Sequence, residues 1–227
     1  MPVYCFMEQV TAEMTMPDTN SYTTRKAYIE EWGTYFKGKM DAGWEGYLIT
    51  LMFKQIPGSE AARLQVMEQE LYRVYATHLS RLFRRPNAPA NRGKLPIWIA
   101  SPDYPVAKQE KVLLDEVRIN DGLHWHVAAL YHRDRRFAGS IEDHFADLMH
   151  IYIHGHHELL RMHISPIETE ERYVVGYGFK TVVKRASIGV DGLIVLPRTT
   201  VRTHNGGADL LGVIHGFRGR SRWISSG

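Results

Sequence analysis

The sequence has a single cysteine, Cys5, among its 227 residues. A lone cysteine excludes a disulfide framework and any zinc site built from several cysteines, so the chemistry has to use other groups. The chain also lacks an apolar run near the ~18 residues that a membrane span needs. Its first residues carry acidic side chains in place of the basic and then apolar pattern of a secretion signal. The sequence therefore predicts a soluble, cytoplasmic protein without a membrane partner.

Net charge is small, because 28 Lys and Arg face 25 Asp and Glu, but its distribution is uneven. Acidic residues dominate up to residue 60, and basic residues dominate from residue 178 onward. A basic C-terminal third suits a polyanion such as nucleic acid, although a solvated face explains it equally simply. The length and the 44% of hydrophobic residues indicate one domain with a sizeable core.

Hydrophobic periodicity and turn residues predict an α+β fold with an antiparallel sheet and helices packed on it. Ser59 caps one expected helix, and Pro166 falls in the first turn of another. Asn120, Asp121 and Gly122 form a turn that joins two expected strands as a hairpin. The expected helices cover 22–40, 60–82, 140–152 and 165–185, and the expected strands cover 47–53, 95–101, 111–119, 123–131 and 190–199.

His124 and His126 are two residues apart in an expected strand, so both imidazoles lie on one face of the sheet. They form part of a metal site that needs at least one more ligand. A three-residue turn places Glu116 opposite His126 on the same face, which makes it the candidate third ligand. This set suits Mn²⁺ or Mg²⁺ with open positions, or zinc. The alternative is a chance pair in a chain with 12 histidines.

Tyr173, Tyr177 and Lys180 are four and three residues apart in the expected helix 165–185, which places them on one stripe. A tyrosine hydroxyl is a weak nucleophile unless a cation or a metal stabilises its anion, and Lys180 is placed to help. Aromatic side chains at this spacing also suit ordinary core packing. The other dense histidine stretch, between His144 and His163, suits surface and packing roles better than a site.

In their order along the chain, these segments resemble the HUH endonucleases, which include rolling-circle replication initiators, relaxases and single-strand transposases. The strand YLITLMF (47–53) is similar to the first motif through Thr50 and Leu51, and His124-Trp125-His126 is similar to the second. YVVGYGFK (173–180) is similar to the two-tyrosine form of the third. The sequence departs from the family at Met52, where a second threonine is common, and at Gly176, where some members have lysine.

The resemblance implies a ferredoxin-like or RRM-like topology whose central antiparallel sheet carries the metal site. The endonuclease domain then covers 45–200, after an N-terminal helical extension (1–44) and before a basic tail (201–227). A divalent Mn²⁺ or Mg²⁺ is held by Glu116, His124 and His126. Tyr177 is the main nucleophile, because Lys180 is its partner, and Tyr173 is an optional second one.

The function that the resemblance implies is nicking of single-stranded DNA, at an origin or a hairpin, through a 5′-phosphotyrosine intermediate. The step initiates rolling-circle replication of a plasmid, phage or mobile element. The chain has no GxxxxGK[ST] loop, so a host helicase and a polymerase are expected partners. Trp98 or Trp125 offers a stacking surface, but Trp125 points away from the histidines, and packing behind the sheet is favoured for it. The expected contacts to the DNA backbone come from Arg84, Arg85, Arg92, Lys94, Lys184 and Arg185.

Other functions remain open from the sequence. A non-catalytic module that binds single-stranded nucleic acid needs the sheet and the basic residues only. A transposase of the same superfamily, a metal-dependent hydrolase of another phosphoester and a structural metal protein use the same histidine pair.

Overall fold

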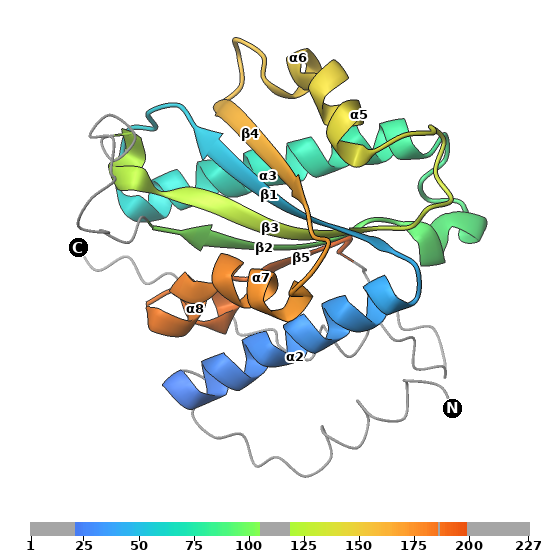
Figure 1. Cartoon of the computed structure of the whole chain (residues 1–227). Coiled ribbons are helices and arrows are strands. Elements are labelled where there is room, and N and C mark those ends of the chain that lie inside the picture. The colour runs from blue at the N-terminus through green and yellow to red at the C-terminus, as the bar shows by residue number, and fades with distance from the viewer. Residues whose placement is uncertain (1–20, 105–118, 186, 199–227) are drawn as a thin grey trace, which may run out of the picture. The chain divides into compact units, whose positions relative to one another are not determined.

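The computed structural model describes residues 21–104, 119–185 and 187–198, which lie almost entirely in one compact unit covering 19–197. An antiparallel sheet runs through this unit with helices on both faces (Figure 1). The strands are β1 (Glu45–Phe53), β2 (Ile97–Asp103), β3 (His124–Tyr131), β4 (Leu159–Pro166) and β5 (Ile194–Leu196). The α-helices are α2 (Tyr22–Asp41), α3 (Glu60–Leu82), α5 (Ile141–Asp147), α6 (Met149–Tyr152), α7 (Glu171–Gly178) and α8 (Lys180–Lys184). Short 3₁₀ helices are η1 (Pro89–Lys94), η2 (Ile119–Gly122) and η3 (Val190–Gly192).

The five strands are ordered β4-β1-β3-β2-β5, and every pairing is antiparallel. β3 is central and has β1 on one side and β2 on the other. The α+β class with an antiparallel sheet, predicted from the sequence, is therefore confirmed. No helix in the described part of the chain is long and apolar enough to cross a membrane.

One face of the sheet carries the main hydrophobic core. Alternate residues of the central strands point to this face, and α3, α5 and α6 cover it. Trp98 and Trp125 lie in this core and are almost fully buried. The Trp98 indole donates a hydrogen bond to the Tyr131 hydroxyl over 3.0 Å. Neither tryptophan is therefore available as a stacking surface. This corrects the expectation for Trp98 and confirms that Trp125 packs behind the sheet.

α2, α7 and α8 cover part of the other face (Figure 1). α2 begins after Ser21, whose side chain accepts a hydrogen bond from the Thr24 backbone, and it packs on both α7 and α8. Arg25 is buried and donates two hydrogen bonds to the Val183 carbonyl, over 3.1 and 3.0 Å. α2 is thus tied into the same unit as the sheet.

Two expectations for the C-terminal half are wrong. Pro166 ends strand β4 and does not start a helix; the helix that follows begins at Glu171 and breaks at Phe179, between α7 and α8. The predicted hairpin is also incorrect, because β1 and β2 pair with both edges of β3; its other strand, expected over 111–119, lies outside the described residues except for Ile119. The helices predicted over 22–40 and 60–82, with the Ser59 cap, agree with the structure. The helix predicted over 140–152 is divided at Leu148 into α5 and α6.

Candidate metal centre

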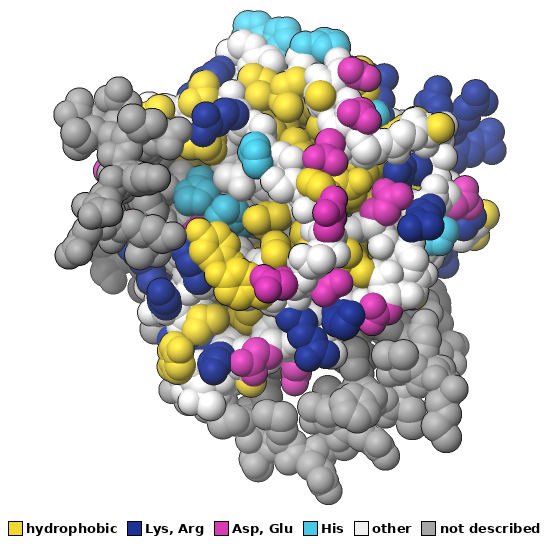
Figure 2. Space-filling model, in the orientation of Figure 1, with side chains coloured by type: hydrophobic (Ala, Val, Ile, Leu, Met, Phe, Trp, Pro, Cys, Tyr) yellow, Lys and Arg dark blue, Asp and Glu magenta, His cyan; other side chains and the backbone are white. Residues whose placement is uncertain are grey.

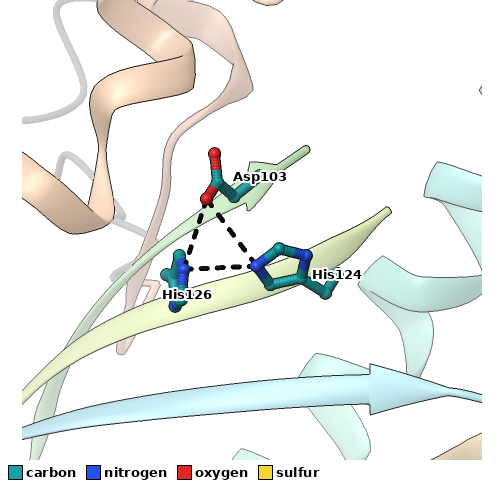
Figure 3. A group of neighbouring side chains, drawn as sticks. All are labelled: Asp103, His124 and His126. Carbon is teal, nitrogen blue, oxygen red and sulfur yellow. Dashed lines mark hydrogen bonds and ion pairs between the residues drawn. The ribbon is translucent and has the colours of Figure 1, made fainter. Parts of the chain in front are cut away.

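Three potential metal ligands converge where β2 ends and β3 begins. Asp103 is the last residue of β2, and the register of the two strands places it directly opposite His124. His126 lies two residues further along β3, on the same face of the sheet. Figure 3 shows the Asp103 carboxylate and the two imidazole rings pointing toward one another. Among the residues that the structure describes, this is the one group of three such side chains whose ligand atoms all lie within 4.8 Å.

The separations of the ligand atoms suit a single ion. The two Nε2 atoms are 3.2 Å apart, and Asp103 Oδ2 lies 3.6 Å from His124 Nε2 and 3.3 Å from His126 Nε2. Three donors that each bind one ion at about 2.1 Å lie roughly 3.0 to 3.5 Å from one another. A divalent cation therefore fits the group without rearrangement of the strands.

Both imidazoles are held with Nε2 facing the centre. His124 Nδ1 donates to the Gly122 carbonyl over 2.8 Å, which leaves Nε2 as a lone-pair donor. His126 Nδ1 lies 3.1 Å from the Thr50 hydroxyl on β1. Hydrogen bonds to the remote nitrogen are the usual device that fixes the tautomer and the ring orientation of a metal-binding histidine. Burial also lowers the pKa of His124, which keeps the ring neutral, as metal binding requires.

Asp103 is fully buried and ionised. Burial acts to raise the pKa of its carboxyl group, but hydrogen bonds from His126, Lys180 and Thr181 outweigh it and hold the pKa far below its usual range. The Lys180 ammonium donates to Oδ2, the oxygen that faces the two histidines, and the Thr181 hydroxyl donates to Oδ1. The centre therefore holds an ionised carboxylate that is paired with the Lys180 ammonium and faces the two imidazoles.

The tyrosines lie beside this centre on α7. The rings of Tyr177 and His126 are 6.5 Å apart, and the Lys180 Nζ lies 4.3 Å from the centre of the Tyr177 ring. Tyr173 stacks on Tyr177 at 6.3 Å, one helical turn further from the centre. Both side chains are accessible, with 43% of Tyr177 and 66% of Tyr173 exposed. The structure thus brings Tyr177, Lys180 and the histidine pair together, although α7 and α8 are separate helices.

The expected third ligand, Glu116, lies outside the described residues. The pairing that led to its choice does not occur, because Thr50 and Ser101 stand opposite His126 on its two sides. Sequence reasoning missed Asp103 because the expected strand 95–101 stopped two residues short of it. Pairing that strand with 123–131 in antiparallel register would have placed Asp103 beside His124.

The expected DNA-contacting residues fall at two distant places. Arg84, Arg85, Arg92 and Lys94 lie on the segment through η1, where Lys94 pairs with Asp134, beyond the far end of β3. A strand rises about 3.3 Å per residue, so this end is roughly 23 Å from His124. Lys184 and Arg185 are exposed at the end of α8. The guanidinium carbon of Arg185 lies 3.8 Å from the centre of the Tyr104 ring, and Tyr104 directly follows Asp103 in the chain.

No protein-family model, curated protein or solved structure matches this chain. The fold and the geometry of the centre define an α+β domain with a buried Asp-His-His group that could bind a metal ion.

Proposed function

We propose that this protein is a metal-dependent tyrosine endonuclease of the HUH type, which nicks single-stranded DNA through a 5′-phosphotyrosine intermediate. The observation that carries the proposal is the position of Tyr177: an exposed hydroxyl-bearing ring next to His126, with Lys180 between that ring and Asp103. The order of elements, β1-α3-β2-β3-α5-α6-β4 with the sheet order β4-β1-β3-β2, is that of ferredoxin-like folds and supports the proposal.

Asp103, His124 and His126 would hold the ion, Mn²⁺ or Mg²⁺, which when bound polarises a phosphate oxygen and offsets the charge of the transition state. The Tyr177 oxygen attacks the phosphorus, and the bond from phosphorus to the 3′ oxygen breaks. The phenolic proton leaves to solvent and the released 3′ oxygen takes up a proton. Lys180 lowers the energetic cost of the developing phenolate, because its ammonium group lies against the same ring.

The part of the sheet formed by β1 and β4 offers a path for the single-stranded DNA. Thr50 on β1 pairs with His126 on one side and with His163 on β4 on the other, and Arg161 stands opposite Met52. Arg161 and His163 are exposed on the face that carries the centre. Figure 2 shows histidine side chains beside a hydrophobic area over α7. A single strand that crosses β1 toward β4 meets a cation here and an exposed aromatic pair at Tyr173 and Tyr177.

The product of the nick, a free 3′-OH on one side and a phosphotyrosine on the other, suits rolling-circle replication. A polymerase extends the 3′-OH, and a host helicase separates the strands. Because one ester replaces another, the reverse step rejoins the DNA. A transposase of the same superfamily would use the same chemistry on different DNA ends.

The test is a covalent-adduct assay with labelled, random-sequence single-stranded DNA and Mn²⁺. A denaturant-resistant DNA–protein band is expected with the unaltered protein, and it should disappear with Tyr177→Phe, with Asp103→Asn and with chelator. Tyr22→Phe, another exposed tyrosine, is the matched control and should keep the band. If only Tyr173→Phe removes the band, the nucleophile is Tyr173 and not Tyr177. If the protein binds the DNA but no variant or metal gives an adduct, the non-catalytic binding module replaces the endonuclease.

The path of the strand has its own test. Arg161→Ala is expected to weaken binding of single-stranded DNA at least fivefold and to reduce its salt dependence, since one phosphate contact is lost. Arg92→Ala, beyond the far end of β3, should leave both unchanged. Equal losses in the two variants would place the DNA elsewhere.

A further inference from the structure

A second group of histidines lies away from the candidate centre, in the turn between α6 and β4. His154, His156 and His157 are close together in the sequence, and the His157 backbone N–H donates to the His154 carbonyl over 2.9 Å, which closes the turn. His154 and His156 are exposed. Figure 2 shows histidine side chains gathered at the top of the molecule, where Figure 1 places this turn.

The rings lie close to one another, but their nitrogen atoms do not converge as those of the candidate centre do. The His154 ring is 5.4 Å from the His156 ring, stacked, and 6.2 Å from the His157 ring. Two imidazoles that bind one zinc ion at about 2.1 Å place their ring centres about 4.5 to 5.3 Å apart. The His124 and His126 rings of the candidate centre, by comparison, are 4.8 Å apart. Binding of one ion by this group therefore requires rotation of its rings, and those of His154 and His156 are exposed.

The backbone of the turn is fixed from outside. The Lys54 ammonium donates to the Gly155 carbonyl over 3.1 Å and to the His157 carbonyl over 2.6 Å. The Lys54 backbone N–H also donates to the Glu158 carbonyl over 2.8 Å, continuing the contact between β1 and the start of β4. A turn held in this way presents its side chains without paying much conformational entropy at the moment of binding.

A carboxylate stands at the edge of the group. Glu70 Oε1 on α3 lies 3.8 Å from His157 Nδ1, and Arg73 holds the same carboxylate through its Nε and Nη2 atoms. Three imidazoles with one oxygen ligand, from Glu70 or from water, make a four-coordinate set typical of zinc. Imidazole-rich sites prefer Zn²⁺, Ni²⁺ or Cu²⁺ over Mg²⁺ and Mn²⁺, which favour oxygen ligands.

We propose that His154, His156 and His157 form a second metal site, specific for zinc-like divalent cations, in the turn between α6 and β4. The site is independent of the proposed nuclease function, and it differs from the candidate centre in having an all-histidine core. Lys54 is its positioning residue, because it acts only through the backbone of the turn.

The test is isothermal titration of the full chain with Zn²⁺ and with Ni²⁺ in a large excess of Mg²⁺. The unaltered protein is expected to bind two equivalents of Zn²⁺, and the double variant His154→Ala, His156→Ala only one. His163→Ala, an exposed histidine on β4, is the matched control and should keep both equivalents. Unchanged stoichiometry and affinity in the double variant would overturn the proposal. A variant with Asp103→Asn and His124→Ala should lose the equivalent of Zn²⁺ bound at the candidate centre and keep the one bound at the second group. Its result therefore tests the candidate centre alone.

Lys54→Met adds a test of the fixed turn. Removing a positive charge would by itself strengthen the binding of a cation, so an affinity at least threefold weaker for the second equivalent shows that Lys54 positions the turn. A tighter second equivalent in Lys54→Met would contradict that role.

Discussion

At the scale of single residues, Asp103 determines the charge of the candidate centre. It is the one carboxylate in the Asp-His-His group, and it is fully buried between Lys180, Thr181 and the two histidines. A buried charge is tolerated only when it is paired, and the loss of one partner would leave it uncompensated. Asp103 is therefore both a candidate metal ligand and the residue through which α8 contacts the centre.

Asp103→Asn is expected to weaken Mn²⁺ binding at least tenfold, because the charged ligand becomes a neutral amide of the same shape. Titration calorimetry at constant pH measures the change. Asp134→Asn, beyond the far end of β3, is the control and should bind as the unaltered protein does. Equal affinity in Asp103→Asn would mean that the ion, if bound, uses other ligands.

Thr50 acts on the centre through His126. Thr50→Val keeps the shape but removes the hydrogen bond to His126 Nδ1, and loss of such an outer partner typically costs about 10- to 100-fold in metal affinity. Thr50→Ser should restore most of the affinity, since it restores the hydroxyl. Equal weakening by both substitutions would point to packing in place of the hydrogen bond.

At the scale of elements, the close approach of α2 to β1 supports the face that carries the centre. A Cβ atom added to Gly46 on β1 would lie 2.5 Å from Met40 Sδ and 2.8 Å from Phe36 Cε1, both on α2. Phe36 is fully buried and cannot move aside. Only glycine allows the helix to pack this close to the strand.

Gly46→Val is therefore expected to destabilise the fold by about 1–3 kcal/mol, the usual cost of overpacking a core. Urea unfolding followed by circular dichroism measures it. Gly38→Ala is the matched control on α2: nothing lies within 4 Å of its added Cβ, so the stability should stay equal or rise by up to about 1 kcal/mol. A neutral Gly46→Val would show that α2 shifts without cost.

At the scale of the whole molecule, buried neutral histidines connect stability to pH. His78 on α3 is fully buried, stacked on Phe145 at 4.3 Å and hydrogen-bonded to the Tyr152 hydroxyl over 3.0 Å. Burial, with smaller contributions from His144 and Arg135, lowers its pKa well below the ordinary value. His124 and His144 shift in the same direction, also through burial.

Because the unfolded chain binds protons at these histidines near pH 6.5 and the folded chain does not, stability should fall as the pH drops below about 6.5. Each such group contributes a slope of up to about 1.4 kcal/mol per pH unit. Chemical unfolding between pH 7.5 and 5 is expected to show a shallower slope in His78→Asn than in the unaltered protein. His163→Asn, an exposed histidine, should leave the slope unchanged. The same slope in His78→Asn would show that His78 is protonated in the folded state.

The sequence by itself determined the local elements and two of the three candidate ligands, His124 and His126. The periodicity that predicts α2 and α3, and the Ser59 cap, depend on neighbouring residues alone, so they could be predicted without the fold. That His124 and His126 share one face is also a local property, because successive side chains of a strand point to opposite faces and these two residues are two positions apart. The same holds for the spacing of Tyr173 and Tyr177.

The tertiary structure decided everything that depends on which strands are neighbours. β1 and β2 both pair with β3, so the turn at Asn120–Gly122 joins no hairpin and Asp103, not a residue of the preceding segment, lies opposite His124. The roles of Thr50 and Thr181 follow from the same pairing and from the packing of α8. Long-range pairing leaves no periodic signal in the sequence, because each strand suits several neighbours and the burial of whole faces selects among them.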